Sequence, residues 1–252
     1  MTNFFVQSCA ENYWFVLPPG ISGTEWHVPA RQLPLLDAIS VPKNTSVLHL
    51  GDIRGEKVGV RTSWLADVMA LLDDFLGKHP FISKVVVHSE SALGWKDGEA
   101  AARKEFWARL ASLSKASAAE IVIENSIILN PSNRYDFVRY PFVLAKEISQ
   151  FGLRMTLDVG HALVFHPLSE LMPLVANNHK VGHLHLGDWQ PSKKPNGNHS
   201  LPLGTGVLPL PEILDRYAGD SCTLEVGWGK LKTLQSVFAL NASRAKVTLG
   251  VT

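Results

Sequence analysis

The chain has 252 residues, of which 46% are hydrophobic and 19% are charged, with 24 lysines and arginines against 23 aspartates and glutamates. This length allows a full hydrophobic core, and the balanced charge does not point to nucleic acid or a membrane surface as partner. No apolar run approaches the roughly 18 to 20 residues that cross a bilayer, and neither Cys9 nor Cys222 belongs to a CxxC motif, so we expect a cytoplasmic globular protein without a disulfide framework.

Short β-branched runs alternate with amphipathic segments along the chain, which is typical of βα units around a parallel sheet. A first strand is expected in "NFFVQSC", and a second between residues 13 and 39, where the Pro- and Gly-rich sequence shows no clear helix. Six clearer strands are expected to begin near residues 45, 84, 121, 154, 181 and 222. Apolar residues at helical spacing predict helices around residues 65–75, 106–113 and 137–151, and weaker ones at 167–175, 210–219 and 230–240.

Eight strands separated by helices predict a (β/α)8 TIM barrel, for which about 250 residues are typical. We expect a single domain over residues 1–252, with the first two βα units shortened or irregular. The alternative is an open doubly wound α/β sheet. It is less favoured because no GxGxxG or Walker-type phosphate loop follows any predicted strand.

Potential metal ligands stand at the ends of the six clear strands: His49, His88, Glu124, Asp158, His185 and Glu225. Because the carboxyl ends of parallel barrel strands share one rim, these side chains are expected to converge on one cavity. The positions two residues earlier are small or apolar, as inward-facing positions of a packed barrel require, with His183 as the exception. Several ionisable groups in one cavity would repel or desolvate one another, so a shared divalent metal is predicted.

The motifs "VIEN", "LDVGHA", "HLHLGD" and "LEV" resemble the xylose isomerase-like TIM-barrel superfamily, which includes sugar isomerases, epimerases and endonuclease IV. The resemblance runs from about the third strand to the eighth and rests on the order Glu, Asp-x-x-His, His-x-x-Asp, Glu. It implies metal ligands at Glu124, Asp158, His185 and Glu225. It also implies that His161 binds substrate and that Asp188 orients a neighbour or joins the site.

The endonuclease branch of the superfamily adds histidines at the ends of the third and fourth strands, where this chain has His49 and His88. A second metal is therefore conceivable, or His88 could bind the substrate instead. That branch also completes a third metal site with an Asp-x-His before a Leu-Gly-x-Gly turn. The matching segment "NHSLPLGTG" has Asn198 and Ser200 in those places, with His199 out of register, which argues against a trinuclear site.

The chemistry can be argued from the residues themselves. A divalent metal held by carboxylates and a histidine can grip a carbonyl and an adjacent hydroxyl, which acidifies the intervening C–H and stabilises an enediolate. Glu124 and Glu225, on opposite parts of the rim, are the predicted base and acid. The oxygen-rich ligands suit Mn, Mg, Co or Fe, with Zn also open. We predict an isomerase or epimerase acting on a small carbohydrate-like molecule, a sugar, sugar phosphate or keto-acid.

Other readings stay open at this stage. An endonuclease IV-like phosphodiesterase or nuclease would use a dinuclear site, and a lyase would share the enediolate. A non-catalytic barrel is disfavoured by the intact ligand set, and a homo-oligomer is open. Trp189, Trp95 and Trp228 follow strand ends and could stack on a sugar ring. Arg54, Lys193 and Lys194 are candidates for binding a phosphate or acid group, and the polar segment 188–206 fits an active-site lid.

Overall fold

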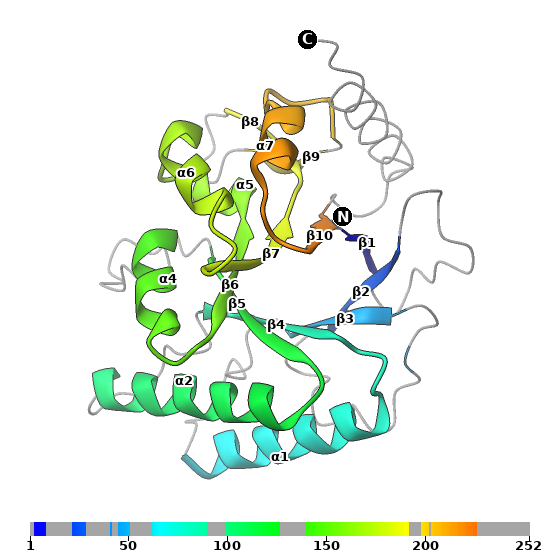
Figure 1. The fold of residues 1–252 in the computed structure, drawn as a ribbon, viewed down its shortest axis with the longest axis vertical. Helices are drawn as coiled ribbons and strands as arrows, with labels where there is room; N and C mark the ends of the chain where they lie inside the picture. The colour runs from blue at the N-terminus through cyan, green and yellow to red at the C-terminus, as the bar shows by residue number, and fades with distance from the viewer. Residues whose placement is uncertain are drawn as a thin grey trace.

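The computed structural model describes residues 3–8, 22–28, 41, 45–50, 62–89, 99–126, 140–191, 198–201 and 203–225. In these ranges eight parallel strands close into a barrel (Figure 1), in the order β1-β10-β7-β6-β5-β4-β3-β2. The strands are β1 (Asn3–Ser8), β2 (Gly23–Val28), β3 (Thr45–Leu50), β4 (Lys84–His88), β5 (Glu120–Glu124), β6 (Arg154–Asp158), β7 (Val181–His185) and β10 (Ser221–Leu224). The predicted barrel is confirmed, and the second strand lies at β2.

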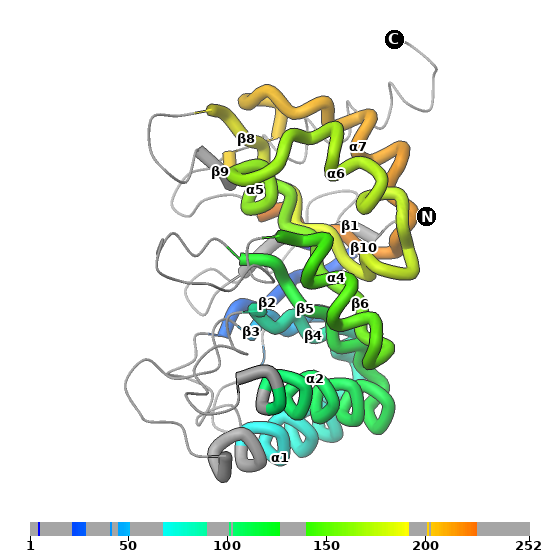
Figure 2. Tube along the Cα trace, turned by 90° about the vertical axis from the view of Figure 1, so that its left-hand side faces the viewer, coloured from blue at the N-terminus to red at the C-terminus, as the bar shows by residue number. Residues whose placement is uncertain are grey.

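The helices follow the predicted alternation: α1 (Thr62–Lys78), α2 (Glu99–Ala116), α4 (Pro141–Ser149), α5 (Val159–Ala162), α6 (Leu168–Val175) and α7 (Leu210–Arg216). Two views show α1 and α2 side by side at one end of the molecule, with α6 and α7 neighbouring each other at the other (Figure 2). Helix α4 begins later than predicted, because Pro141 supplies a first residue whose missing N–H is not needed there. The helix expected at 230–240 and the segments that follow β1 and β2 lie outside the described residues.

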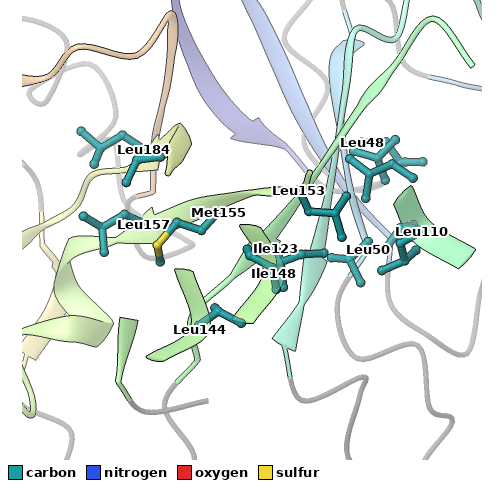
Figure 3. Packing of buried hydrophobic residues seen from close by; sticks show 14 of the residues in the cluster. Leu48, Leu50, Leu110, Ile123, Leu144, Ile148, Leu153, Met155, Leu157 and Leu184 are labelled. Carbon is teal, nitrogen blue, oxygen red and sulfur yellow. The ribbon is translucent and has the colours of Figure 1, made fainter. Parts of the chain in front are cut away.

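Barrel strands divide their side chains between two buried layers. Outward-facing residues such as Ile123, Met155 and Leu157 pack against helix residues such as Leu144 and Ile148 (Figure 3). A separate cluster of Phe5, Val47, Val86 and Val122 fills the barrel interior. Alternation along a strand explains both layers, since successive side chains point to opposite faces. The three valines lie where the sequence placed inward-facing residues.

The amino-terminal end of the barrel is closed by an ion-pair network around Lys84 of β4. Its Nζ lies 2.7 Å from Glu120 Oε2 and 3.3 Å from Asp220 Oδ1, and it donates to the Gly182 carbonyl at 2.9 Å. Arg154 donates to the other oxygen of Glu120. These charges lie at the end of the barrel opposite to the predicted site, the end that serves stability in this fold.

The polar segment 188–206, expected to be a loop, contains two short antiparallel strands, β8 (Asp188–Gln190) and β9 (Asn198–Leu201). Asp188 explains the local order, because its carboxylate accepts the backbone N–H groups of Gly204 at 2.9 Å, Gly206 at 2.7 Å and Leu208 at 3.1 Å. In the described part of the chain, no helix is both long and apolar enough to cross a bilayer.

Candidate metal and active site

The four predicted metal ligands meet at the carboxyl-terminal rim of the barrel. Glu124, Asp158 and His185 end β5, β6 and β7, and Glu225 directly follows β10. One possible ligand atom from each of the four lies within 4.8 Å of the others. Nδ1 of His185 is 3.4 Å from a Glu225 oxygen and 3.5 Å from Glu124 Oε2. Residues from four separate strands are therefore gathered around one point.

Strand pairing and two hydrogen bonds between Asn125 and Asp158 hold the four side chains in this arrangement. Asp158 pairs with His185 across β6 and β7, and Thr223 pairs with His185 across β10 and β7. Asn125, next to Glu124, donates from Nδ2 to the Asp158 carbonyl at 3.0 Å and accepts the Asp158 N–H at 2.9 Å. Asp158 in turn accepts the His161 N–H at 2.7 Å, capping the short helix α5. These hydrogen bonds fix the backbone at two of the four candidate ligands, Glu124 and Asp158.

Two buried atoms at this point have no hydrogen-bond partner, Oε2 of Glu124 and Nδ1 of His185. Both residues are at most 1% exposed. An unsatisfied buried polar atom costs about 1 to 3 kcal/mol, and more if charged. The two atoms lie 3.5 Å apart as an ion pair, and a bound cation would use both of them. Three carboxylates and one imidazole match the hard, oxygen-preferring divalent cations, and the residues present fit such an ion.

The ionisable side chains of the site interact with one another, and these interactions shift their pKa values. Burial would raise the pKa of Glu124, but the imidazoles of His88, His185 and His49 hold it well below its usual value. Burial also opposes ionisation of Glu225, yet the neighbouring His185 lowers its pKa to about 2. Burial, with repulsion from Glu225 and Glu124, raises the pKa of Asp158 to about 7 despite the attraction of His161.

Carboxylates of the site shift the pKa of His185 and His49 upward. Burial would lower the pKa of His185, but Glu25 and Glu124 hold it well above its usual value. Burial likewise opposes protonation of His49, whose pKa is nevertheless raised to about 10 by Glu124 and Glu25. The excess negative charge at the rim thus attracts positive charge, which a divalent cation could supply in place of protons.

His161 and His88, predicted to contact substrate, both border the four-residue group. The ring of His161 lies 3.3 Å from an Asp158 oxygen, and its Nδ1 is 3.1 Å from the Asn125 carbonyl, to which it can donate. Nε2 of His88 lies 3.4 Å from Glu124 Oε2. Nε2 of His49 lies 2.7 Å from that same His88 nitrogen and 3.2 Å from Glu124 Oε2.

A second grouping of possible ligands consists of His49, Glu124 and His185. His88 lies beside this grouping, with its Nε2 at hydrogen-bonding distance from the Nε2 of His49, an arrangement in which one proton lies between two imidazoles. The structure therefore brings the predicted second-metal histidines together as a hydrogen-bonded pair beside Glu124. The prediction that they hold a second ion remains a prediction.

Sequence reasoning missed two residues of β2, Glu25 and His27. Glu25 is fully buried and lies at hydrogen-bonding distance from three histidines, His49, His183 and His185. The ring of His27 meets that of His49 edge-on at 4.8 Å, and burial together with His49 and His88 lowers the pKa of His27 to about 4. Their spacing of two residues was the available signal, since it places both on one face of a strand.

The remaining predicted residues fall in different places. Trp189 lies on β8 and borders a cavity of about 430 Å³ together with Leu163, His166, Leu168 and Val207 among others, a cavity lined by none of the four candidate ligands. The carboxylate of Asp188 accepts hydrogen bonds from several backbone N–H groups, and Asp188 is not among the four residues of the candidate metal group. Residues Trp95, Trp228, Arg54, Lys193 and Lys194 lie outside the described part of the chain.

Comparison with known proteins relates this architecture to one family. The family model described as xylose isomerase-like TIM barrel matches residues 72–218. No curated protein sequence matches the chain. Among solved structures, a D-tagatose 3-epimerase-like protein is similar, with 16% identity, full coverage of both chains and a TM-score of 0.65.

Two further solved structures are similar over almost the whole chain. The 3-keto-D-glucoside 4-epimerase YcjR from E. coli is 13% identical, with 97% of this chain and 100% of that chain covered and a TM-score of 0.64. An AP endonuclease, family 2, from Brucella melitensis is 14% identical, with 95% and 98% covered and a TM-score of 0.60. At these identities the similarity establishes the fold.

Proposed function

Because the chain belongs to the xylose isomerase-like TIM barrel family, we propose that it is a divalent-metal-dependent isomerase or epimerase of a carbohydrate-like hydroxy-carbonyl compound. The observation that carries the proposal is the convergence of Glu124, Asp158, His185 and Glu225, with two buried ligand atoms lacking hydrogen-bond partners. These four side chains would hold the cation. Mn, Mg, Co, Fe and Zn are all compatible with three carboxylates and an imidazole.

A cation bound there would polarise the carbonyl and the neighbouring hydroxyl of a substrate and offset the negative charge that develops on them. Glu124 and Glu225 are the proposed proton carriers. Glu124 ends β5 and Glu225 follows β10, and these two strands have β6 and β7 between them in the barrel order. They therefore approach a bound molecule from different sides, as a base and an acid must when a proton leaves one position or face and returns at another.

The surroundings suggest roles for two histidines. His161 follows Asp158 by one helical turn and is 14% exposed at its side chain, and the side chain of His88 is 20% exposed. Both are more accessible than the buried His185, so they can reach a substrate that lies over the cation. We propose that they donate hydrogen bonds to substrate hydroxyl groups, and Trp189 on β8 stays a candidate for stacking.

The substrate class draws support from the neighbours' names. Two of the three solved structures above are described as epimerase or epimerase-like for a sugar or sugar derivative. A sugar or sugar phosphate carries the carbonyl and adjacent hydroxyl that the proposed chemistry needs. We infer a substrate of this kind, whether phosphorylated or not.

Proton transfer on carbon can be tested without knowing the physiological substrate. Ketoses, aldoses, keto-acids and their phosphates would be incubated with the protein and Mn²⁺, Mg²⁺ or Co²⁺ in deuterated water. We expect NMR to show deuterium entering the carbon next to the carbonyl of at least one compound. Glu124→Gln and Glu225→Gln should each slow this exchange by about 10² to 10⁴, the usual contribution of a general acid or base.

Glu105→Gln on the exposed face of α2 is the matched control, since it makes the same chemical change far from the rim and should leave exchange unchanged. Metal content of every variant should be measured alongside, because loss of the cation would also stop exchange. Exchange that persists in both rim variants would contradict the assigned roles. No exchange with any compound would contradict the proposed activity.

A second candidate function is a metal-dependent phosphodiesterase or nuclease. The pair of His49 and His88 beside Glu124 is the observation that favours it, because a second ion held there would neighbour the first, and two neighbouring ions are a common device for phosphodiester cleavage. Cleavage of an abasic-site DNA or a model phosphodiester under the same metal conditions, without any deuterium exchange, would support this alternative over the isomerase.

A further inference from the structure

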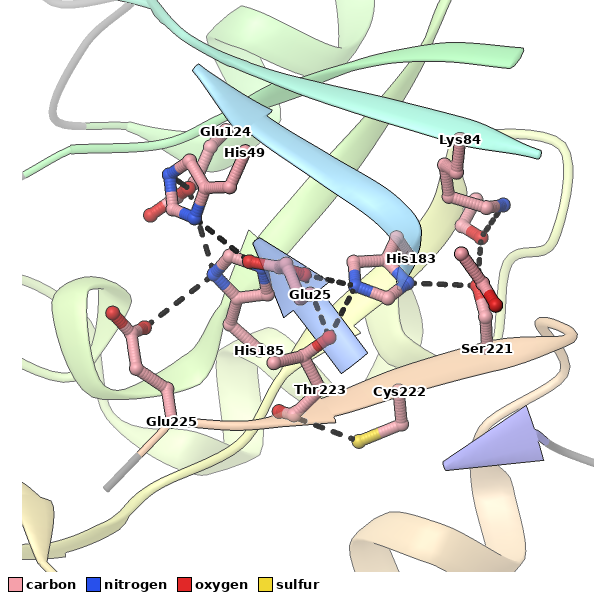
Figure 4. Close-up of polar contacts among 12 residues, drawn as sticks. Glu25, His49, Lys84, Glu124, His183, His185, Ser221, Cys222, Thr223 and Glu225 are labelled. Atoms are coloured by element: carbon pink, nitrogen blue, oxygen red, sulfur yellow. Dashed lines mark hydrogen bonds and ion pairs between the residues drawn. The ribbon is translucent and has the colours of Figure 1, made fainter. Parts of the chain in front are cut away.

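Glu25 of β2 lies inside the barrel beneath the candidate metal group and is completely buried. A buried carboxylate is strongly unfavourable unless hydrogen bonds and opposite charges compensate for the lost water. Here four donors converge on its two oxygens (Figure 4): His49 Nδ1 at 2.7 Å, His183 Nε2 at 3.1 Å, His185 Nε2 at 3.1 and 3.2 Å, and Thr223 Oγ1 at 2.6 Å. Glu25 is therefore an acceptor at the centre of a dense network.

The side chains around Glu25 are held by hydrogen bonds with one another and do not form a separate cation site. Glu25, His183 and His185 offer ligand atoms that lie close together. Both ring nitrogens of His183 are already engaged, however, Nδ1 with Ser221 Oγ at 2.7 Å and Nε2 with Glu25 and Thr223. His183 and Thr223 instead hold Glu25 in place from β7 and β10.

The contact with Glu25 decides which ring nitrogen of His185 carries a hydrogen. An ionised carboxylate can only accept, so the His185 nitrogen that faces Glu25, Nε2, carries a hydrogen. The other nitrogen, Nδ1, then points to Glu124 and Glu225 at 3.5 and 3.4 Å. It has no hydrogen-bond partner, although it is buried. Once a cation takes the place of the Nδ1 proton, this tautomer directs the Nδ1 lone pair toward the centre of the candidate metal group.

The same carboxylate orients His49. Nδ1 of His49 donates to Glu25, which leaves Nε2 facing Glu124 at 3.2 Å and His88 at 2.7 Å. One buried residue of β2 thus sets the ring orientation of two imidazoles that stand on β7 and β3. Carboxylates that accept the second N–H of a ligating histidine are known to fix its tautomer and raise its basicity.

We propose that Glu25 is a positioning residue of the candidate metal site: it fixes His185 with Nδ1 toward the cation and His49 with Nε2 toward Glu124. This inference rests on the proposed cation site but not on the reaction that the site performs. Glu25 contacts neither the cation nor the substrate. Its role is to decide which nitrogen of each imidazole the rim can use.

Glu25→Gln tests the inference, because the amide keeps the shape but replaces one acceptor oxygen by an N–H₂ donor that faces imidazole N–H groups. Calorimetric titration of chelator-stripped protein with Mn²⁺ should show affinity weakened by about 10 to 100-fold, the usual effect of losing such a partner. Glu105→Gln on the exposed face of α2 makes the same chemical change away from the rim, and as the control it should keep the affinity within about twofold, since distant sites act independently.

A second measurement needs no variant. In ¹⁵N-labelled wild-type protein loaded with Zn²⁺, long-range ¹H–¹⁵N correlation should show His185 with its hydrogen on Nε2 and the metal on Nδ1. Metal on Nε2 of His185, or Mn²⁺ affinity unchanged in Glu25→Gln, would overturn the proposal. Wild-type protein that binds no Mn²⁺ would overturn it together with the cation site. Weakened metal binding without any deuterium exchange would support Glu25's role while contradicting the proposed isomerase.

Discussion

Asp188 is a buried carboxylate at a strand end that serves the fold and not the candidate metal group. Besides its own neighbour Trp189, it accepts the N–H groups of Gly204, Gly206 and Leu208. A Cβ on Gly206 would lie 2.4 Å from the Asp188 carboxylate, so the turn needs a glycine to approach this closely. The motif "HLHLGD" therefore combines a candidate ligand, His185, with an aspartate that organises the following turn.

Replacing Asp188 with alanine should destabilise the protein by about 3 kcal/mol or more, because several buried N–H groups lose a charged acceptor at once. Asp188→Asn should be destabilised less, since one acceptor oxygen remains. Urea unfolding curves would measure both values. An alanine variant that is as stable as the wild type but no longer binds metal would show that Asp188 belongs to the site after all.

At the same scale, the residues of the site were predictable to different degrees. Glu124, Asp158, His185 and Glu225 could be predicted because each follows an apolar run whose period marks it as a strand, and barrel geometry brings such ends together. Glu25 and His27 were missed, because their strand lies in a Pro- and Gly-rich region without a clear flanking helix, and their spacing of two residues alone does not identify a strand. Asp188's role was also beyond reach, since it depends on a turn sixteen to twenty residues later.

Among the elements, the connection from α7 to β10 shows how a short segment is fixed by one buried side chain. Tyr217, at the end of α7, is 6% exposed and donates its hydroxyl proton to the Ser221 carbonyl at 2.7 Å. Burial, with the nearby Cys222 and Asp220, raises the pKa of Tyr217 far above its usual value. The folded protein therefore keeps the phenol neutral at a pH where the unfolded chain would ionise it.

This shift predicts a pH dependence of stability. Because the folded pKa is raised, the contribution is fully present below the unfolded pKa of about 10 and is lost as pH rises beyond it. Above about pH 10, the free energy of unfolding of the wild type should fall about 1.4 kcal/mol per pH unit more steeply than that of Tyr217→Phe. Urea unfolding at several pH values between 9 and 11 would measure the two slopes, and equal slopes would contradict this account.

The hairpin of β8 and β9 was not predicted from the sequence. The segment 188–206 contains three prolines, and five of the seven residues in "SKKPNGN" are polar or charged, a composition typical of loops. Two short strands nevertheless pair within it, with Asp188 opposite Leu201 and Gln190 opposite Asn198. Pairing of strands this short depends on the anchored Asp188 and not on local β-propensity, which is why the pattern did not reveal it.

Over the whole molecule, polar side chains extend through the barrel from rim to base. Glu25, His183, Thr223 and Ser221 connect the candidate site with the charged network around Lys84 (Figure 4). A barrel interior is usually filled by branched apolar residues, and within the described residues the side lined by Phe5, Val47, Val86 and Val122 follows that rule. The exception that the sequence flagged, His183, lies in this polar part of the interior.

The barrel itself was predictable because its strands and helices keep their periods over most of the chain. The two layers of buried side chains follow directly from alternation along each strand. A single domain over residues 1–252 stays a prediction, since the residues after 225 are not described. Assembly into a homo-oligomer likewise stays a prediction.

The proposed function depends on the binding of one divalent cation by Glu124, Asp158, His185 and Glu225. Anomalous scattering from crystals grown with Mn²⁺ would test this binding. We predict one strong anomalous peak per chain, with oxygen or nitrogen atoms of all four side chains about 2.0 to 2.3 Å away. Two peaks, the second at His49 and His88, would favour the phosphodiesterase alternative. No peak among the four residues, or a peak elsewhere, would contradict the proposed binding.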